Sequence, residues 1–287
     1  RVGVKKLVLA DFDVVEPSNL NRQQYFVRHI GLKKTQALKE LINDVNPFVE
    51  VETHDIFLDE KNVASVFSEC EILCEAFDNV AGKTMILNEA GASLKEKKIL
   101  GLASGGGQQM PIFTAAGADC TVLDYSEKQL EAERIVAERE NYQINIVSAD
   151  MSEPFPFADA AFDIIFHPVS NCYIEKVEPV FLECFRILKK GGVLLCGLDT
   201  GINYIVDQKE EKIINALPFN PLVYEAHRKQ LEDTDSGWQF SHSLTEQLGG
   251  QLRAGFTLTD IYEDTNGDGR LHELHIPSFI ATRAVKQ

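Results

Sequence analysis

Short apolar runs alternate regularly with longer stretches of helical periodicity along this chain. The apolar runs are nearly continuous, which is typical of strands that helices cover on both faces. Alternating strands and helices build βαβ units around a mainly parallel sheet, so we expect an α/β protein. The predicted strands are 7–10, 49–53, 72–76, 99–103, 120–123, 144–149, 162–166 and 193–198, and the clearest predicted helices are 33–45, 127–139 and 177–188.

A seam near residues 90–96 divides the chain into two unequal parts. Three predicted strands precede the seam, and the seven predicted strands after it look like a complete set. Because no internal repeat relates the two parts, we expect two different α/β modules in series, residues 1–90 and residues 93–287.

The strand-helix rhythm breaks within the second module. Residues 200–243 carry many charges, two prolines and Trp238, the only tryptophan. A long segment of this kind inserted late in an α/β sheet is often a lid over the substrate, and we expect one here. The runs 256–262 and 276–284 then predict two strands that end the sheet in antiparallel fashion.

The net charge and the cysteine content disfavour several classes of function. The chain has 28 basic and 44 acidic residues, a formal net charge of −16, which disfavours binding to nucleic acid or to an anionic membrane. The sequence has no apolar run long enough for a transmembrane helix and no recognisable signal peptide. Six scattered cysteines without a CxxC pair predict buried thiols rather than a zinc site. We therefore expect a cytoplasmic protein.

A glycine-rich turn follows the predicted strand 99–103. Ser104 and the glycines after it lead into a helix, so free backbone N–H groups can approach a ligand closely. The next strand ends in Asp124, which can accept hydrogen bonds from both hydroxyls of a ribose. The strand after that ends in Asp150-Met151, which can hold the edge and face of an adenine. The fourth strand ends in Phe166-His167. The glycine turn alone would also suit a dinucleotide-binding domain, and Asp124 alone is equally compatible with a solvated strand end. Four strand ends in this order nevertheless predict a nucleoside site.

Residues 93–287 resemble the class I S-adenosylmethionine-dependent methyltransferases. The matching segments are LGLASGGGQQ, TVLDYSEKQL, VSADM, FDIIFHPVSNCY, ECFRILKKGGVLL and IATRAVK. The resemblance implies a Rossmann-like seven-stranded sheet, S-adenosylmethionine as cofactor, and methyl transfer to an acceptor that the sequence does not name. The cofactor residues it implies are Ala103, Ser104, Gly105, Asp124, Tyr125, Gln129, Asp150 and Met151. The sequence departs from the family at Gly101, where an acidic residue is usual, and at Ala103, where a glycine is frequent.

The end of the fourth strand of this module supplies the candidate for catalysis. His167 is placed where a general base can face the transferred methyl group. The alternative is a histidine that packs against the cofactor or caps the strand. Asn171, Cys172 and Tyr173 follow closely and are expected to line the acceptor pocket.

The acidic segment 264–269 imitates the start of a calcium-binding loop. The twelfth position of such a loop requires a bidentate glutamate, and His275 stands there instead. We therefore expect a tight turn between the last two strands.

The first module carries a second resemblance. The strand ending at Asp11 and Asp13, the string VEPSNLNRQ, the segment GLKK and the segment EAFDN resemble the ThiF family of adenylyltransferases, relatives of ubiquitin-activating enzymes. The resemblance implies that Asp11 binds ribose, that Lys34 contacts the triphosphate and that Asp78 positions magnesium. The full set of implied ATP-site residues is Asp11, Asp13, Asn21, Arg22, Lys34 and Asp78.

The first strand and the phosphate-binding glycine loop of that family would precede Arg1. We therefore expect a partial module with a vestigial ATP site and a sheet edge at which a second copy can pair. The predicted function is methyl transfer from S-adenosylmethionine. The alternatives are ATP-dependent activation of a sulfur-carrier C-terminus and nucleotide binding without turnover.

Overall fold

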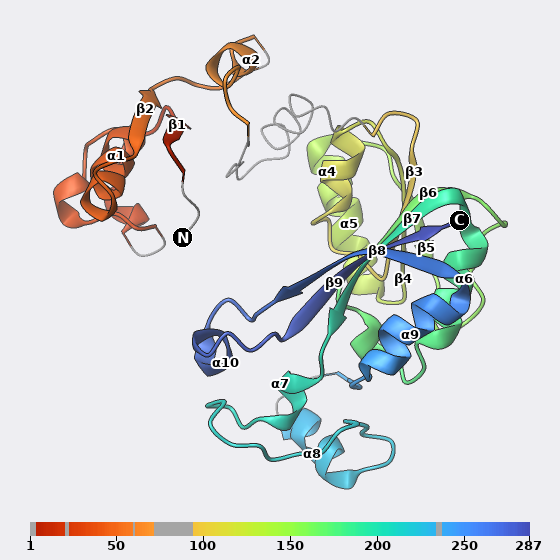
Figure 1. Cartoon of the computed structure of the whole chain (residues 1–287). Helices are drawn as coiled ribbons and strands as arrows, with labels where there is room; N and C mark the ends of the chain where they lie inside the picture. The colour runs from red at the N-terminus through yellow and green to blue at the C-terminus, as the bar shows by residue number, and fades with distance from the viewer. Residues whose placement is uncertain (1–3, 21–22, 60, 72–93, 234–236) are drawn as a thin grey trace. The chain divides into compact units, whose positions relative to one another are not determined.

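The computed structural model describes residues 4–20, 23–59, 61–71, 94–233 and 237–287. The chain divides into two compact units, Arg1–Ser93 and Leu94–Gln287 (Figure 1). Each unit is described by itself.

The N-terminal unit contains a small parallel sheet. Strand β1 (Lys6–Ala10) pairs with β2 (Glu50–His54), and α1 (Lys34–Val45) connects them as a βαβ crossover. The predicted strands 7–10 and 49–53 and the predicted helix 33–45 are therefore confirmed, whereas the predicted strand 72–76 lies outside the described residues. The remaining short helices of this unit are η1 (Pro17–Asn19), η2 (Val27–His29) and α2 (Val63–Val66).

The C-terminal unit is built on a seven-stranded sheet with the order β5-β4-β3-β6-β7-β9-β8. The first five strands in this order are parallel, and β9 is antiparallel to both of its neighbours. This arrangement confirms the predicted Rossmann-like sheet with an antiparallel end. The strands are β3 (Lys98–Leu102), β4 (Asp119–Asp124), β5 (Asn145–Ser148), β6 (Phe162–His167), β7 (Leu188–Asp199), β8 (Phe256–Asp264) and β9 (Phe279–Lys286).

Helices cover both faces of the sheet, which explains why its central strands are continuously apolar. Successive residues of β3 point to opposite faces: Ile99 joins a core with Met110 and Leu130, and Leu100 joins the larger core with Phe181. The first core lies under α4 (Met110–Ala115) and α5 (Glu127–Glu140), and the second lies under α6 (Glu178–Ile187) and α9 (Leu244–Ala254).

The helix ends follow local sequence signals. The Ser126 side chain caps the start of α5, and Asn141 ends this helix in the left-handed conformation. Helix α9 begins with a capping box between Ser243 and Glu246 and ends at Gly255 with φ of 106°. No described helix is long and apolar enough to span a bilayer.

The prediction of a tight turn at 264–269 is wrong. The connection between β8 and β9 contains a short helix, α10 (Gly269–Glu273), which buries Leu271. The Leu271 N–H donates to Glu210 Oε2 at 2.6 Å, so a residue distant in sequence helps to hold this helical turn. The segment between β7 and α9 contains α7 (Ile202–Ile205) and α8 (Glu225–Asp233).

Candidate functional site

The turn after β3 lies at the edge where the carboxyl ends of the parallel strands meet. The Ala103 N–H donates to Leu123 O at 2.7 Å, which fixes the start of the turn against β4. Ala103 has φ of 47°, in the left-handed region that favours glycine. Glycine adopts this φ without strain, which explains why the family frequently has glycine at this position. In this chain an alanine adopts the left-handed conformation instead. Ser104, the next cofactor candidate, is buried.

Asp124 organises the glycine turn. Its Oδ2 accepts a hydrogen bond from Gly105 N at 2.9 Å, and its Oδ1 accepts one from Ser126 N at 2.8 Å. A Cβ on Gly105 would lie 2.8 Å from Gln129 Cβ, so only glycine allows the turn to approach α5 this closely. The structure thus brings together three of the predicted residues, Gly105, Asp124 and Gln129. Tyr125 lies beside them with 76% of its surface exposed.

The end of β5 brings the remaining cofactor candidates to the same edge. The Ala149 N–H donates to Asp124 O at 3.1 Å, which joins the two strand ends. Asp150 Oδ1 accepts hydrogen bonds from the backbone and hydroxyl of Ser152, and Met151 is buried in the larger core. The edge therefore offers carboxylates, backbone N–H groups and apolar side chains, the groups that a nucleoside requires.

His167 is fully buried, and both of its ring nitrogens have partners. Nδ1 lies 3.0 Å from Leu102 O, and Nε2 lies 2.7 Å from the side-chain amide of Asn171. Burial lowers the pKa of His167, although both hydrogen bonds oppose this effect, so the ring is neutral near pH 7. These contacts link His167 to the end of β3 and to Asn171, which favours the alternative of a histidine that caps its strand over a general base.

A neutral His167 also determines how the Asn171 amide is oriented. Because Nδ1 faces a carbonyl oxygen, it carries the ring proton. The structure places Asn171 Oδ1 beside Nε2, and a neutral ring can accept at Nε2 only when the amide is turned to present its NH₂ there. The other polar atom of the Asn171 amide, which is then its oxygen, is buried without a partner among the described residues. Asn171 therefore has one unused acceptor at the end of β6.

Residues 171–173 form a short helix, η3, on which the segment 200–243 packs. The Phe240 N–H donates to Cys172 O at 2.7 Å, and His242 Nε2 donates to Asn171 O at 3.0 Å. Burial raises the pKa of the Cys172 thiol to about 11, so this thiol is not an effective nucleophile near pH 7. Tyr173 is 58% exposed and is close enough to Asp124 for that carboxylate to raise the pKa of its phenol, an effect smaller than those of Cys172 and burial.

The prediction missed Asp199, which ends β7 near Cys172. Burial raises the pKa of Asp199, while hydrogen bonds from Gly201 N and Asn203 Nδ2 oppose the rise. The sequence signal was available, because Asp199 ends its strand in the same way as Asp124.

In the N-terminal unit, the structure gathers three of the predicted ATP-site residues at the end of β1. Asp13 N donates to Asp11 Oδ1, and Lys34 Nζ donates to Asp13 Oδ2, each at 2.8 Å. Partial burial lowers the pKa of Lys34, but the hydrogen bond to Asp13 and the charges of both aspartates outweigh it and raise the pKa overall. Asn21, Arg22 and Asp78 lie outside the described residues.

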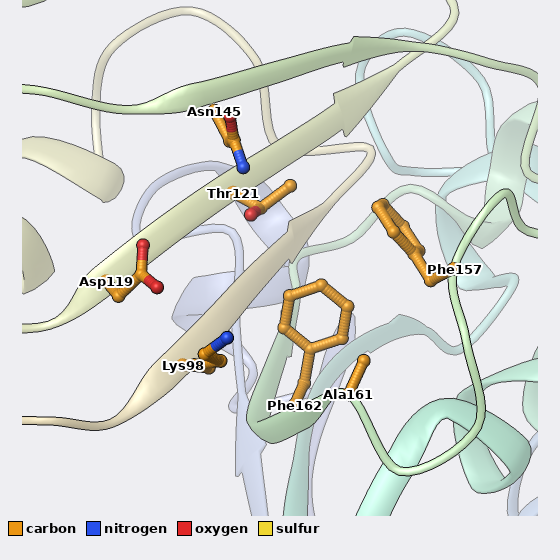
Figure 2. Close-up of a pocket in the computed structure, with 7 residues that line it drawn as sticks. All are labelled: Lys98, Asp119, Thr121, Asn145, Phe157, Ala161 and Phe162. Carbon is orange, nitrogen blue, oxygen red and sulfur yellow. The ribbon is translucent and has the colours of Figure 1, made fainter.

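A hollow of roughly 160 Å³ lies at the opposite edge of the large sheet, where strands begin (Figure 2). Lys98, Asp119, Asn145 and Phe162 line it, and each is the first residue of its strand. Ligand sites of open α/β sheets lie at the carboxyl ends of the strands, and this hollow is smaller than such sites usually are. We therefore do not assign it to the cofactor.

Comparisons with known proteins define the class. The sequence profile described as "Methyltransferase domain" matches residues 93–245, and that of the ThiF family matches residues 1–152. Over 200 residues, 67% of this chain, the sequence is 41% identical to an uncharacterized methyltransferase of Bacillus subtilis, YbaJ, and covers 78% of that protein. A solved S-adenosylmethionine-dependent methyltransferase from Mesorhizobium loti matches with a TM-score of 0.55 and 18% identity, covering 67% of this chain and 92% of that one.

The N-terminal part has different relatives. It is 29% identical over 119 residues, 41% of this chain, to the adenylyltransferase and sulfurtransferase MOCS3 of Aedes aegypti. This chain covers 27% of the length of that relative. The ThiF match extends past the predicted boundary near residue 90, whereas the structure places β3, β4 and β5 in the seven-stranded sheet.

The fold and these comparisons define a methyltransferase of the Rossmann-like class. The chain belongs to the methyltransferase domain family, and its N-terminal part belongs to the ThiF family. Both predicted resemblances and the predicted enzyme class are therefore confirmed.

Proposed function

We propose that the C-terminal unit binds S-adenosylmethionine at the ends of β3, β4 and β5 and transfers its methyl group to a small acceptor. The observation that carries the proposal is the convergence of Gly105, Asp124 and Gln129 at this edge. Asp124 would accept hydrogen bonds from the ribose hydroxyls, and exposed Tyr125 and buried Met151 would contact the adenine. Bound S-adenosylmethionine would supply a sulfonium methyl group that a nucleophile displaces in line.

The residues of the chain would act mainly by holding the two reactants in position. Asn171 lies on η3, and its side chain is buried with one amide atom that has no partner among the described residues. Tyr173 presents an exposed ring beside it. We place the acceptor over η3, between the cofactor residues and the segment 200–243.

The test is cofactor binding by titration calorimetry. Asp124→Ala should weaken S-adenosylmethionine binding by about 1–3 kcal/mol, the cost of losing charge-assisted hydrogen bonds. Asp119→Ala removes a carboxylate from the other end of the same strand and should leave the affinity unchanged. Equal affinities for the wild type and Asp124→Ala would contradict the assigned site.

We also propose that residues 200–243 act as a lid over the acceptor. Hydrogen bonds to Asn171 and Cys172 place this segment on η3, and Tyr204, Phe219 and His227 stack within it at centroid distances of 4.9 and 4.3 Å. Cofactor or acceptor binding should change the fluorescence of Trp238 and slow amide exchange in the segment. Exchange that is fast and independent of ligand would count against a lid.

We propose a cytoplasmic location and a small-molecule acceptor rather than nucleic acid. The described cysteines are free thiols, and four of them are buried, as expected in a reducing compartment. The net charge of −16 opposes approach to a phosphate backbone. Within the described residues β1 pairs only with β2, so we also propose that a second copy can add to this edge, which analytical ultracentrifugation tests.

A further inference from the structure

Helix α5 buries a carboxylate on the face that packs against the sheet. Its buried residues are Leu130 and Glu133, and the Glu133 side chain is fully inaccessible to solvent. At this position the helical pattern predicts an apolar residue such as Leu130. A buried carboxylate costs free energy, so the position calls for a specific explanation.

Glu133 contacts the glycine turn directly. Its Oε2 accepts a hydrogen bond from Gly107 N at 2.7 Å, and its Oε1 accepts one from the Tyr142 hydroxyl at 3.1 Å. Within the described residues no cation forms an ion pair with Glu133. Burial raises the pKa of Glu133, and the two hydrogen bonds offset this only in part.

The backbone at Gly107 also approaches α5 closely at a second residue, Val136. Gly107 has φ of 69°, and a Cβ there would lie 2.5 Å from Val136 Cγ2 on the next turn of α5. The turn that carries the cofactor residues is therefore attached at two points. Asp124 holds Gly105 at one point, and Glu133 holds Gly107 at the other.

We infer that Glu133 is a positioning residue for the cofactor, with Tyr142 orienting its carboxylate. The inference deepens the proposed function and rests on it. Ordering the glycine turn in advance lowers the entropy that cofactor binding would otherwise cost. Glu133 is not among the apolar residues of the core that contains Leu130, and its carboxylate contacts the glycine turn instead.

Three variants separate this role from a merely structural one. Glu133→Gln retains an oxygen that can accept from Gly107 N but loses the charge. Glu133→Leu combined with Tyr142→Phe removes the carboxylate and the hydroxyl that donates to it, which leaves Gly107 N without this acceptor. Tyr142→Phe alone keeps the Gly107 contact, and Glu138→Gln, the control, changes an exposed residue of the same helix.

The full chain is titrated with S-adenosylmethionine and with S-adenosylhomocysteine, and the thermal midpoint of each variant is recorded. We expect Glu133→Gln to bind both ligands roughly fivefold to thirtyfold more weakly, and the double variant to bind them more weakly still. The thermal midpoint of Glu133→Gln should stay the same or rise. The affinity of Tyr142→Phe for both ligands should lie within about threefold of the wild-type affinity. The affinity of Glu138→Gln should equal that of the wild type.

The outcomes distinguish the two proposals. Wild-type affinity in Glu133→Gln and in the double variant would overturn the role of Glu133 while leaving the cofactor site standing. Weaker binding that always accompanies a lower thermal midpoint would show a structural role and also overturn the inference. A wild-type chain that binds neither ligand would overturn the proposed function and the inference with it.

Discussion

Two strands of similar composition have different environments in the two units. Strand β1 reads KLVLA and β3 reads KILGL, and each begins with lysine and continues as an apolar run. The four residues after the lysine are only partly buried in β1, whereas all four are buried in β3. Strand β3 has hydrogen-bonded partners on both sides, β4 and β6, while β1 pairs in the described residues with β2 alone.

The difference shows that an apolar run predicts a strand but not the degree of its burial. Burial depends on the neighbouring strands and on helices that pack on each face, and these come from distant parts of the sequence. The larger unit provides such neighbours for β3. We therefore expect the two units to differ in local stability.

Truncating one leucine in each strand should give the largest difference. Leu100 is fully buried in the larger core, and Leu100→Ala should cost about 2–5 kcal/mol of the unfolding free energy of the C-terminal unit. Leu9 is only partly buried, so Leu9→Ala should cost its own unit about 1 kcal/mol. Amide hydrogen exchange at β3 and at β1 measures the loss of unfolding free energy in each unit. Equal losses in the two units would contradict the expected difference.

The second prediction concerns nucleotide binding by the two units. Lys34 is already paired with Asp13, and this ion pair reduces the positive charge that Lys34 can offer to a phosphate. We expect the chain to bind ATP at least a hundredfold more weakly than S-adenosylmethionine, about 2.7 kcal/mol, and to catalyse no ATP–pyrophosphate exchange. Calorimetry with both ligands checks this, and measurable exchange would favour adenylyltransferase activity instead.

The third prediction concerns the buried carboxylate of α5. Because burial raises the pKa of Glu133, the folded chain binds this proton more tightly than the unfolded chain does. The stability of the wild type should therefore fall relative to Glu133→Gln as the pH rises from the ordinary glutamate pKa through the raised one. Urea unfolding followed by Trp238 fluorescence at several pH values measures the difference, and parallel curves would refute it.

The smallest expected effect concerns the backbone at Ala103. Glycine avoids the steric cost of φ near 47° but loses more entropy on folding, so Ala103→Gly should stabilise the unit by about 0.5–1 kcal/mol. Ala115→Gly, in α4, should destabilise it by a similar amount. Opposite shifts of the thermal midpoint would support this account, and a destabilising Ala103→Gly would exclude it.

Much of the fold could be predicted because each strand has a local signal. The central strands were placed within a residue or two, since apolar runs such as those of β4 and β6 end at a polar residue. The start of β7 was predicted five residues too late, because Lys189 and the glycines that follow it are typical of a turn. Helix α10 was missed because it depends on the burial of Leu271 and on Glu210, contacts that no local pattern reveals.

The candidate site was predictable where it consists of strand ends and less so elsewhere. Asp124 and Gly105 meet as expected because parallel strands place their carboxyl ends at one edge. The protonation and hydrogen bonding of His167 were not predictable, since they depend on Leu102 O and on an amide four residues away. Glu133 looks like any helical glutamate in the sequence, and only the fold brings it to Gly107.

The order of strands also has a consequence for synthesis on the ribosome. Strand β9 is the last strand of the large sheet along the chain, yet it lies between β7 and β8. During translation β8 emerges before the only strand with which it pairs in the described sheet, and β7 has one unpaired edge. The nascent methyltransferase unit can therefore complete its sheet only after translation has passed Lys286, so chaperones that shield apolar edges would act on it late in synthesis.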